Sequence, residues 1–149
     1  MRNFGWCIWL IPEKESLWHT YTDGFSPHIT IKSCLEQKEA LKLFNSIQKS
    51  LEAFSLTVCL QGYCQQTYSK KFAALYYDVN PVPSTTYPSW WPENAHMSFR
   101  YQYSKLFDSS DLSKLDSTIN QKTASVTSIA LVHCNGHYST WKTEQEYCA

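Results

Sequence analysis

The chain has 149 residues, the length of one domain, and its 13 Lys and Arg residues balance its 13 Asp and Glu residues. A strongly basic nucleic-acid-binding protein is disfavoured because such proteins carry a net positive charge, so we expect no binding of duplex DNA. Aromatic residues make up 15% of the chain, which with only four Gly and six Pro excludes a disordered or collagen-like chain. These numbers predict one globular domain over residues 1–149.

The apolar segments and the cysteines indicate the cellular compartment of the protein. The longest apolar run, residues 4–11, is shorter than the ~20 residues that cross a bilayer, and no signal-peptide cleavage site follows it. The six cysteines contain no C-x-x-C pair and are too few for a disulfide scaffold. We therefore expect a cytoplasmic protein with no membrane partner. Its thiols should be free, although some cysteines fall in or beside predicted strands, where two of them can meet: Cys7, Cys59, Cys134 and Cys148.

The first half of the chain alternates strands with one long helix. Residues 5–11 form an apolar strand, and residues 13–22 form a short connection with room for a helical turn. Alternating apolar residues predict a second strand over residues 28–35. Residues 36–54 carry apolar side chains at the i, i+3, i+4, i+7 spacing of an amphipathic helix with a lysine-rich outer face.

Two strands complete this half. They cover residues 55–66 and 72–80, and the second is a continuous apolar run that predicts burial on both faces. Residues 82–91 form a loop rich in Pro and aromatic residues, which cannot hold regular structure for long. This loop separates the two halves.

The second half repeats the order of strand, helix and strands. Residues 95–103 alternate as a strand, and residues 108–120 have the acidic start and apolar spacing of a helix. Residues 125–134 and 139–147 are expected to close the chain as a hairpin over Asn135-Gly136, because this dipeptide is a strong turn signal.

A histidine and a hydroxyl two residues apart occur in matching places of the two halves. These are His28-Ile29-Thr30 and His96-Met97-Ser98, and the strand period of two puts the imidazole and the hydroxyl of each motif on one face. A third instance, His137-Tyr138-Ser139, shows that the pattern also arises by chance. The first two differ from it because each lies in a strand that precedes a helix, at positions 68 residues apart.

With these motifs the chain resembles the 2H phosphoesterase superfamily, and within it the cyclic phosphodiesterase branch. The segments that carry the resemblance are IWLIPEKES (8–16), SPHITI (26–31), AHMSFRY (95–101) and STWKT (139–143). The resemblance implies an α+β fold of two lobes, in which two antiparallel sheets are related by pseudo-twofold symmetry and carry helices on the outside. The segment between the motifs is shorter than is usual in the family, and Lys32 and Arg100 stand where its members usually have apolar or small residues.

The resemblance also implies the chemistry. It suggests His28, Thr30, His96 and Ser98 as catalytic residues of a metal-independent and cofactor-free hydrolysis, with His96 as the base on water and His28 as the acid on the leaving oxygen. Imidazole suits both roles because its ordinary pKa is near 6.5, and hydroxyls can hold the charged phosphoryl oxygens.

Four further residues are candidates for substrate binding. Tyr101 and Trp9 can stack on a base, although core packing is an alternative for each, as it is for Phe72 and Trp90. Lys32 and Arg100 share strand parity with the motif residues and would line the same face of a straight strand, where they can hold phosphate; solvated charges are the alternative.

The expected substrate is a ribose cyclic phosphate: a 2′,3′-cyclic nucleotide, an RNA end or an ADP-ribose cyclic phosphate. A 2′-5′ linked or cyclic signalling oligonucleotide is the alternative, and a non-catalytic RNA-end or protein-binding module is a third class. We expect a monomer. The run His133-Cys134-x-x-His137 lacks a fourth ligand, so we predict no zinc site there.

Overall fold

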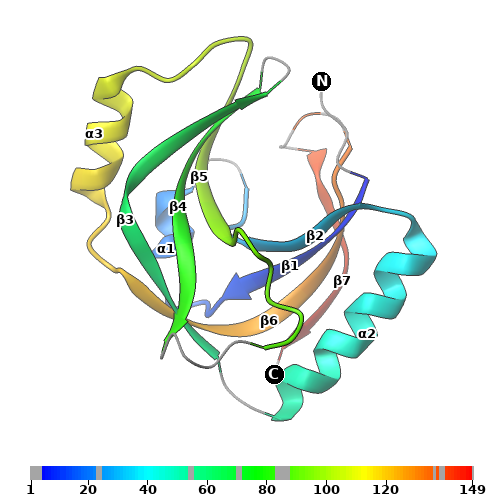
Figure 1. Ribbon diagram of the computed structural model, residues 1–149. Helices are drawn as coiled ribbons and strands as arrows, with labels where there is room; N and C mark the ends of the chain where they lie inside the picture. The colour runs from blue at the N-terminus through cyan, green and yellow to red at the C-terminus, as the bar shows by residue number, and fades with distance from the viewer. Residues whose placement is uncertain are drawn as a thin grey trace.

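The computed structural model describes residues 5–22, 25–53, 56–69, 72–82, 88–135, 137 and 140–148. Within these residues the chain forms strands and three helices, shown in Figure 1. The strands are β1 (Trp6–Pro12), β2 (Ile29–Leu35), β3 (Leu56–Ser69), β4 (Phe72–Val82), β5 (His96–Tyr103), β6 (Thr123–His133) and β7 (Lys142–Cys148). The helices are α1 (Trp18–Tyr21), α2 (Gln37–Ala53) and α3 (Ser109–Thr118).

The strands form one antiparallel sheet that closes into a ring. Its order is β1-β2-β5-β4-β3-β6-β7, and β6 also pairs with β1 from Trp6 to Pro12. Six strands therefore make a closed barrel, and β7 is added on the outer edge of β6 beyond the point where β3 leaves it. The expected two separate sheets are corrected to one continuous sheet, because β6 joins β1 on one side to β3 on the other.

The ring has the same connectivity in both halves of the chain. Exchanging β1 with β4, β2 with β5 and β3 with β6 reproduces every neighbour in the ring. The exchange also swaps α2, which follows β2, with α3, which follows β5. The approximate twofold axis of this topology passes between β2 and β5, the two strands that carry the histidine motifs.

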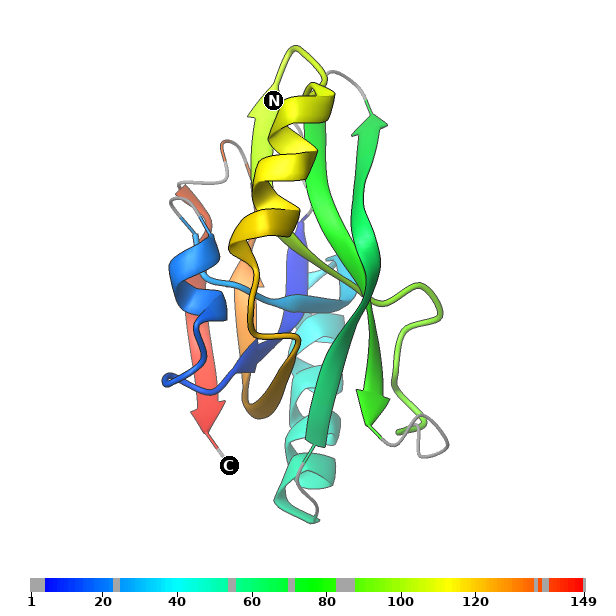
Figure 2. The same ribbon diagram turned by 90° about the vertical axis from the view of Figure 1, so that its left-hand side faces the viewer.

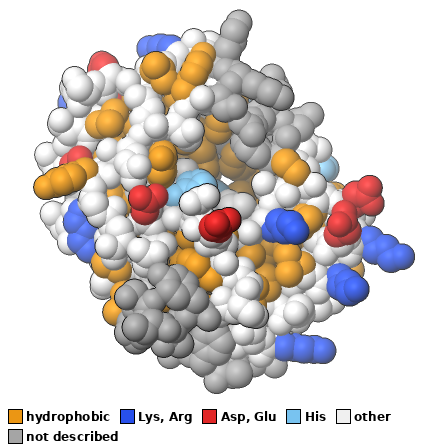
Figure 3. All heavy atoms as spheres, viewed as in Figure 1, with side chains coloured by type: hydrophobic (Ala, Val, Ile, Leu, Met, Phe, Trp, Pro, Cys, Tyr) orange, Lys and Arg blue, Asp and Glu red, His pale blue; other side chains and the backbone are white. Residues whose placement is uncertain are grey.

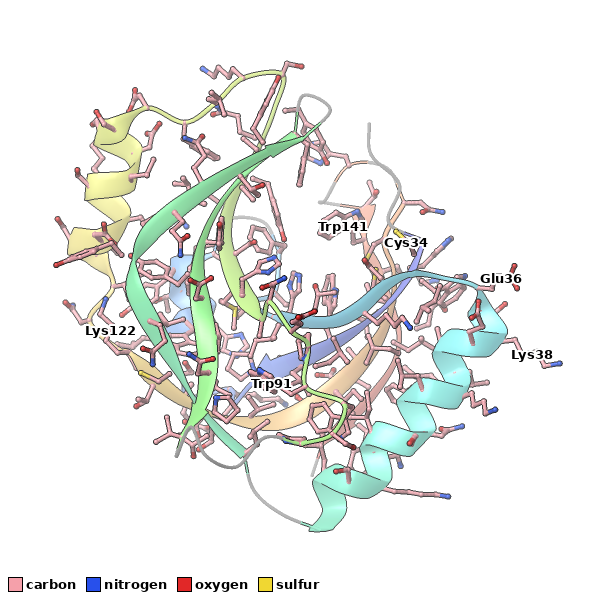
Figure 4. The ribbon with its side chains drawn as sticks, viewed as in Figure 1. Cys34, Glu36, Lys38, Trp91, Lys122 and Trp141 are labelled. Carbon is pink, nitrogen blue, oxygen red and sulfur yellow. The ribbon has the colours of Figure 1, made fainter. Side chains whose placement is uncertain are left out.

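The two longer helices lie outside the ring, as the resemblance implies (Figure 1). Helix α2 packs against β1 and β6, and its polar side chains, among them Lys38, point away from the sheet (Figure 4). Helix α3 packs on β3 and lies on the outer surface of the sheet in the turned view (Figure 2). It begins at a capping box, in which the Asp108 carboxylate accepts from the backbone N–H of Asp111 at 2.9 Å and the Asp111 carboxylate accepts in return.

The two faces of the sheet pack against different hydrophobic clusters. Along β1, Ile8 and Leu10 belong to the main core beneath the helices, whereas Cys7, Trp9 and Ile11 belong to a smaller cluster on the opposite face. This alternation is the period of two expected of a strand with both faces covered. Of the smaller cluster, Cys7 and Trp9 line the cavity described below.

The strands and helices predicted from the sequence pattern are confirmed, with small shifts at their ends. The predicted burial of β4 on both faces holds for Phe72–Leu75 and then gives way to alternation. β6 and β7 do pair as a hairpin, but His133 pairs with Lys142, so the connection is longer than the expected two-residue turn. Gly136 in that connection and residues 83–87 of the predicted loop lie outside the described residues.

Among the helices that the structure describes, none combines the length and the apolar character needed to cross a membrane.

Candidate active site

The two histidine motifs face each other across neighbouring strands. β2 and β5 pair antiparallel at Ile29 and Met97, so His28 lies opposite Ser98 and Thr30 lies opposite His96. Ile29 and Met97 are fully buried in the core, so the four motif side chains emerge on the other face. Directly opposite residues have Cβ atoms ~4.5–5.5 Å apart and diagonal ones ~7–8 Å, so the two histidines are spaced to hold one phosphate group between them.

A cavity of about 190 Å³ opens on this face of the sheet. Six of the predicted site residues line it: Trp9, His28, Thr30, His96, Ser98 and Tyr101. Figure 3 shows a hollow near the middle of this side of the molecule with histidine atoms at its edge. A cavity of ~150 Å³ accepts a benzene ring, so this one has room for one ring of a ligand that continues into solvent.

Both imidazoles are held in the same way. Nδ1 of His28 donates to the backbone carbonyl of Ser26 at 2.7 Å, and Nδ1 of His96 donates to that of Asn94 at 3.0 Å. A carbonyl can only accept, so each bond fixes the proton on Nδ1 and leaves Nε2 as the atom that gains or loses a proton. This arrangement suits either a general base or a general acid.

Aromatic rings from the flanking strands distinguish the two histidines. Trp9 lies flat on His28, with ring centroids 3.5 Å apart, and His28 is 4% exposed. Tyr76 meets His96 edge-on at 5.3 Å and leaves it exposed. The pKa of His28 is lowered to about 4, chiefly by burial; the bond to Ser26 opposes this effect, and the nearby His96 adds a smaller lowering. His28 is therefore neutral at pH 7.

This pKa predicts a pH-dependent stability. Because the pKa of His28 is 6.5 when unperturbed and about 4 in the folded protein, the unfolded chain binds the proton more readily between these values. The free energy of unfolding should therefore be highest above pH 6.5. As the pH falls from 6.5 to 4, it should decrease by up to about 1.4 kcal/mol per pH unit. Urea unfolding above and within the window measures this, and the slope should shrink in His28→Gln. An equal slope in that variant would contradict the assignment.

The far wall of the cavity is aromatic. Tyr101 lies at 5.0 Å from Phe72, at 4.5 Å from Phe25 and at 5.5 Å from Trp141, measured between ring centroids. Burial raises the pKa of Tyr101, and a hydrogen bond with the Ser98 side chain opposes that rise. The phenol therefore stays neutral and ties the aromatic wall to the hydroxyl of the second motif.

Matching irregularities interrupt both motif strands immediately after the hydroxyl. In β2 the pairing steps from Trp9 opposite Thr30 to Ile8 opposite Lys32. In β5 it steps from Tyr76 opposite Ser98 to Leu75 opposite Arg100. Each step leaves one extra residue, a bulge, which reverses the alternation of side chains beyond it. Lys32 and Arg100 thus turn with Ile8 and Leu75 towards the other face of the sheet.

The expected roles of Lys32 and Arg100 at the site are therefore corrected. Neither lines the cavity. Lys32 is exposed to solvent, and Arg100 donates through Nη1 to the backbone carbonyls of Tyr21 and Phe99, behind the sheet. The bulge in β5 also makes Tyr101 face the cavity. On a regular strand, Tyr101 would face the opposite side of the sheet from His96 and Ser98.

Several residues of the cavity were not among the predicted ones. They are Cys7, Ser33, Thr67, Ala74, Cys134 and Trp141, with Phe72 considered only as an alternative. Cys7 could have been predicted to line the cavity because it lies two residues before Trp9 on the same face of β1. Ser33 could not, because it faces the cavity only as a result of the bulge in β2. Trp141, just before β7, also lines the cavity and is labelled in Figure 4. Trp90, also considered for stacking, packs against the main core.

Two of the cysteines meet, as their placement in strands allowed. The side chains of Cys7 and Cys134, which both line the cavity, form a hydrogen bond, and that bond together with burial raises the pKa of the Cys134 thiol. Neither is joined in a disulfide, and Cys34, Cys59 and Cys64 are not either.

The residues considered for zinc are separated. His133 stacks on Trp6 at 4.7 Å and accepts from the Asn135 amide at 2.9 Å, whereas Cys134 turns to Cys7. His137 lies against Tyr103 at 4.8 Å. Within the described part of the chain, no three His, Cys, Asp or Glu side chains are grouped as metal ligands.

No family model matches the sequence, and no curated protein matches it. Among solved structures, the fold is similar to Usb1 from Kluyveromyces marxianus, determined with uridine monophosphate. The match covers 95% of this chain and 97% of that chain with a TM-score of 0.49, and 12% of aligned residues are identical. Likeness at this level does not show a shared activity, so the function has to be argued from the site.

Proposed function

We propose that the protein is a metal-independent phosphodiesterase that acts on a ribose phosphodiester by acid–base catalysis with two histidines. The observation that carries this proposal is the antiparallel pairing of β2 and β5 at Ile29 and Met97, which puts two imidazoles and two hydroxyls on one face at the mouth of a cavity. Displacement at phosphorus needs a proton acceptor on one side and a proton donor on the other. Two imidazoles in diagonal positions supply both.

The protonation of His28 favours His28 as the base and His96 as the acid, the reverse of the assignment drawn from the family resemblance. A group with a pKa of about 4 carries no proton at neutral pH and can accept one. In this scheme Nε2 of His28 takes a proton from the attacking hydroxyl, the bond from phosphorus to the leaving ribose oxygen breaks, and Nε2 of His96 gives that oxygen a proton. Solvent then returns the proton from His28 to His96.

The hydroxyls of the motifs have a separate task. Thr30 and Ser98 line the cavity between the histidines, where the non-bridging phosphoryl oxygens would lie. Hydrogen bonds that are already oriented stabilise the charge on these oxygens as it grows in the transition state. Ser98 is positioned by its bond to Tyr101, and Trp9 keeps His28 in place. In the proposal Trp9 is therefore a positioning residue, and the aromatic wall that includes Tyr101 and Phe72 is the surface for a base.

The expected substrates are ribose cyclic phosphates, and the test is a panel assayed with EDTA. It contains 2′,3′-cyclic mononucleotides, an RNA end with a cyclic phosphate, ADP-ribose cyclic phosphate, and 2′-5′ linked and cyclic oligonucleotides, with products identified by mass. At least one should be turned over without metal, with a bell-shaped dependence of kcat/KM on pH because one imidazole must be neutral and the other charged. Binding of an RNA end without turnover would instead support the non-catalytic module, and loss of activity with EDTA would contradict the mechanism.

A second candidate within this chemistry is a phosphodiesterase of oligonucleotides. A specific observation favours it: the space around His96 continues beyond the active cavity into a second cleft.

A further inference from the structure

A pocket lies on the other side of the sheet from the active cavity. It has a volume of about 160 Å³ and lies between β4, β5 and helix α3, which is on the outer surface of the sheet in Figure 2. Leu75 and Arg100, cross-strand partners in β4 and β5, line it, whereas their neighbours Ala74 and Tyr101 line the active cavity. In the described part of the chain the two spaces share no lining residue, and we call this one the rear pocket.

The guanidinium of Arg100 uses only one of its nitrogens to hold the fold together. Nη1 donates to the backbone carbonyl of Phe99 at 2.8 Å and to that of Tyr21. Among the described residues, no group accepts from Nε or Nη2, and no carboxylate forms an ion pair with Arg100. The N–H groups of Nε and Nη2 lie side by side along one edge of the guanidinium, the geometry that pairs with both oxygens of a carboxylate. Because Arg100 lines the rear pocket, this edge is available to an anion there.

The charged groups of the rear pocket leave one positive charge unbalanced. Arg100 and Lys114 bring two positive charges, and Asp111 brings one negative charge. The Asp111 carboxylate already accepts from the backbone N–H of Asp108 at 3.1 Å in the cap of α3. Lys114, like Arg100, forms no ion pair with a described residue. A ligand with one negative charge balances the pocket, whereas Asp111 repels a second one.

The remaining walls of the rear pocket are mostly apolar. Leu75 and Leu115 belong to the buried main core, and Phe107 packs against it. The Thr118 hydroxyl donates to the backbone carbonyl of Lys114 at 2.8 Å, so the side-chain donors left for a ligand among these lining residues are the two cations. A cavity of ~150 Å³ accepts a benzene ring, so the rear pocket has room for an apolar group of that size.

We propose that the rear pocket binds an organic monocarboxylate that carries an apolar group of about one ring. The carboxylate pairs with Nε and Nη2 of Arg100, near the Lys114 ammonium. The apolar group contacts Leu75, Phe107 and Leu115. A carboxylate fits better than a phosphate dianion because it is planar, matches the edge of the guanidinium and brings one charge. The site is separate from the active cavity, so the inference goes beyond the proposed function and does not depend on it.

The test measures the binding of benzoate by isothermal titration calorimetry at neutral pH and fixed ionic strength. Benzoate should bind with a Kd of about 1 mM or below, which is within reach of a ligand of its size. Benzyl alcohol has the ring without the charge, and acetate has the carboxylate without the ring, so each should bind at least about tenfold more weakly. Equal affinity for benzyl alcohol would mean that the pocket is only apolar, and equal affinity for acetate would mean that it is only cationic. Either result would overturn the inference.

Two variants locate the bound benzoate. Arg100→Gln should raise the Kd by about tenfold or more, because charge-assisted hydrogen bonds are lost. Lys114→Gln should raise it by about two- to fivefold, the effect of one exposed charge. Arg100 also holds two backbone carbonyls, so Arg100→Gln should first be shown to unfold cooperatively. Lys114 is exposed, and Lys114→Gln decides the question if Arg100→Gln does not fold.

Two further variants are the controls. Lys105→Gln removes the same charge from an exposed lysine that does not line the rear pocket, so the Kd should stay within about 1.5-fold. His96→Gln changes only the active cavity and should also leave the Kd for benzoate unchanged. A Kd that responds to His96→Gln and not to Lys114→Gln would place benzoate in the active cavity and overturn the inference. Absence of saturable binding at millimolar benzoate would overturn it too, and both results leave the proposed function intact because turnover tests that separately.

Discussion

Replacing either His28 or His96 by Ala is expected to lower kcat by about 10²- to 10⁴-fold, the contribution usual for a general acid or base. The reason is that each Nε2 is the only atom of its ring free to exchange a proton, because each Nδ1 is bound to a carbonyl. Single-turnover measurements on a substrate from the panel separate this loss in the chemical step from changes in binding. Because the two residues act as a unit, the double variant should lose less than the product of the two single losses.

The third histidine motif provides the control. His137 is part of the same H-x-hydroxyl pattern but does not line the cavity, so His137→Ala should keep kcat within about twofold. Near-normal turnover by His28→Ala or His96→Ala would refute the two-histidine mechanism. Both variants should first be shown to unfold cooperatively, since His28 is buried against Trp9.

Phe99→Ala is expected to lower the free energy of unfolding by about 3–5 kcal/mol, the cost of removing a buried aromatic ring. Phe99 is fully buried and meets the edges or faces of three rings, those of Trp18, Tyr21 and Tyr77, with centroids 6.5, 6.1 and 5.9 Å away. It also lies in the bulge of β5 between Ser98 and Arg100. Urea unfolding followed by tryptophan fluorescence measures the loss.

An exposed aromatic residue gives the comparison. Tyr63 in β3 is 81% exposed, so Tyr63→Ala should change the free energy of unfolding by less than about 0.5 kcal/mol. A loss below about 1 kcal/mol in Phe99→Ala would contradict this expectation and would mean that the core closes over the space left by the ring.

The elements of this fold could be predicted because local rules determine them. The apolar spacing of residues 36–54 and the acidic start at Asp108 predict α2 and α3, and alternation predicts the strands. The closure of the sheet could not be predicted in this way. It depends on pairing β1 with β6, segments more than a hundred residues apart, and no local pattern specifies which distant strand completes a ring.

The candidate site shows the same division. The spacing within each motif sufficed to put His28 and Thr30, and His96 and Ser98, on common faces. Beyond the hydroxyls the regular period fails, because one extra residue in each strand reverses the faces, and the guanidinium of Arg100 ends behind the sheet. The cleft next to His96 could not be predicted from the sequence either. Asp78, Asn94 and Thr67 come together only because β3, β4 and β5 are neighbours in the sheet.

The junction between β2 and β5 is the shortest stretch of strand pairing among the described strands, a single pair at Ile29 and Met97. Ile29, next to His28, also pairs with Leu10 of β1, and His96 pairs with Asp78 of β4. The spacing of the two imidazoles then depends on the opposite side of the ring, where β6 joins β1 to β3. In the proposed mechanism, a substitution in β6 can therefore change the spacing of the two imidazoles without contacting either, and residues that affect the rate need not lie in the cavity.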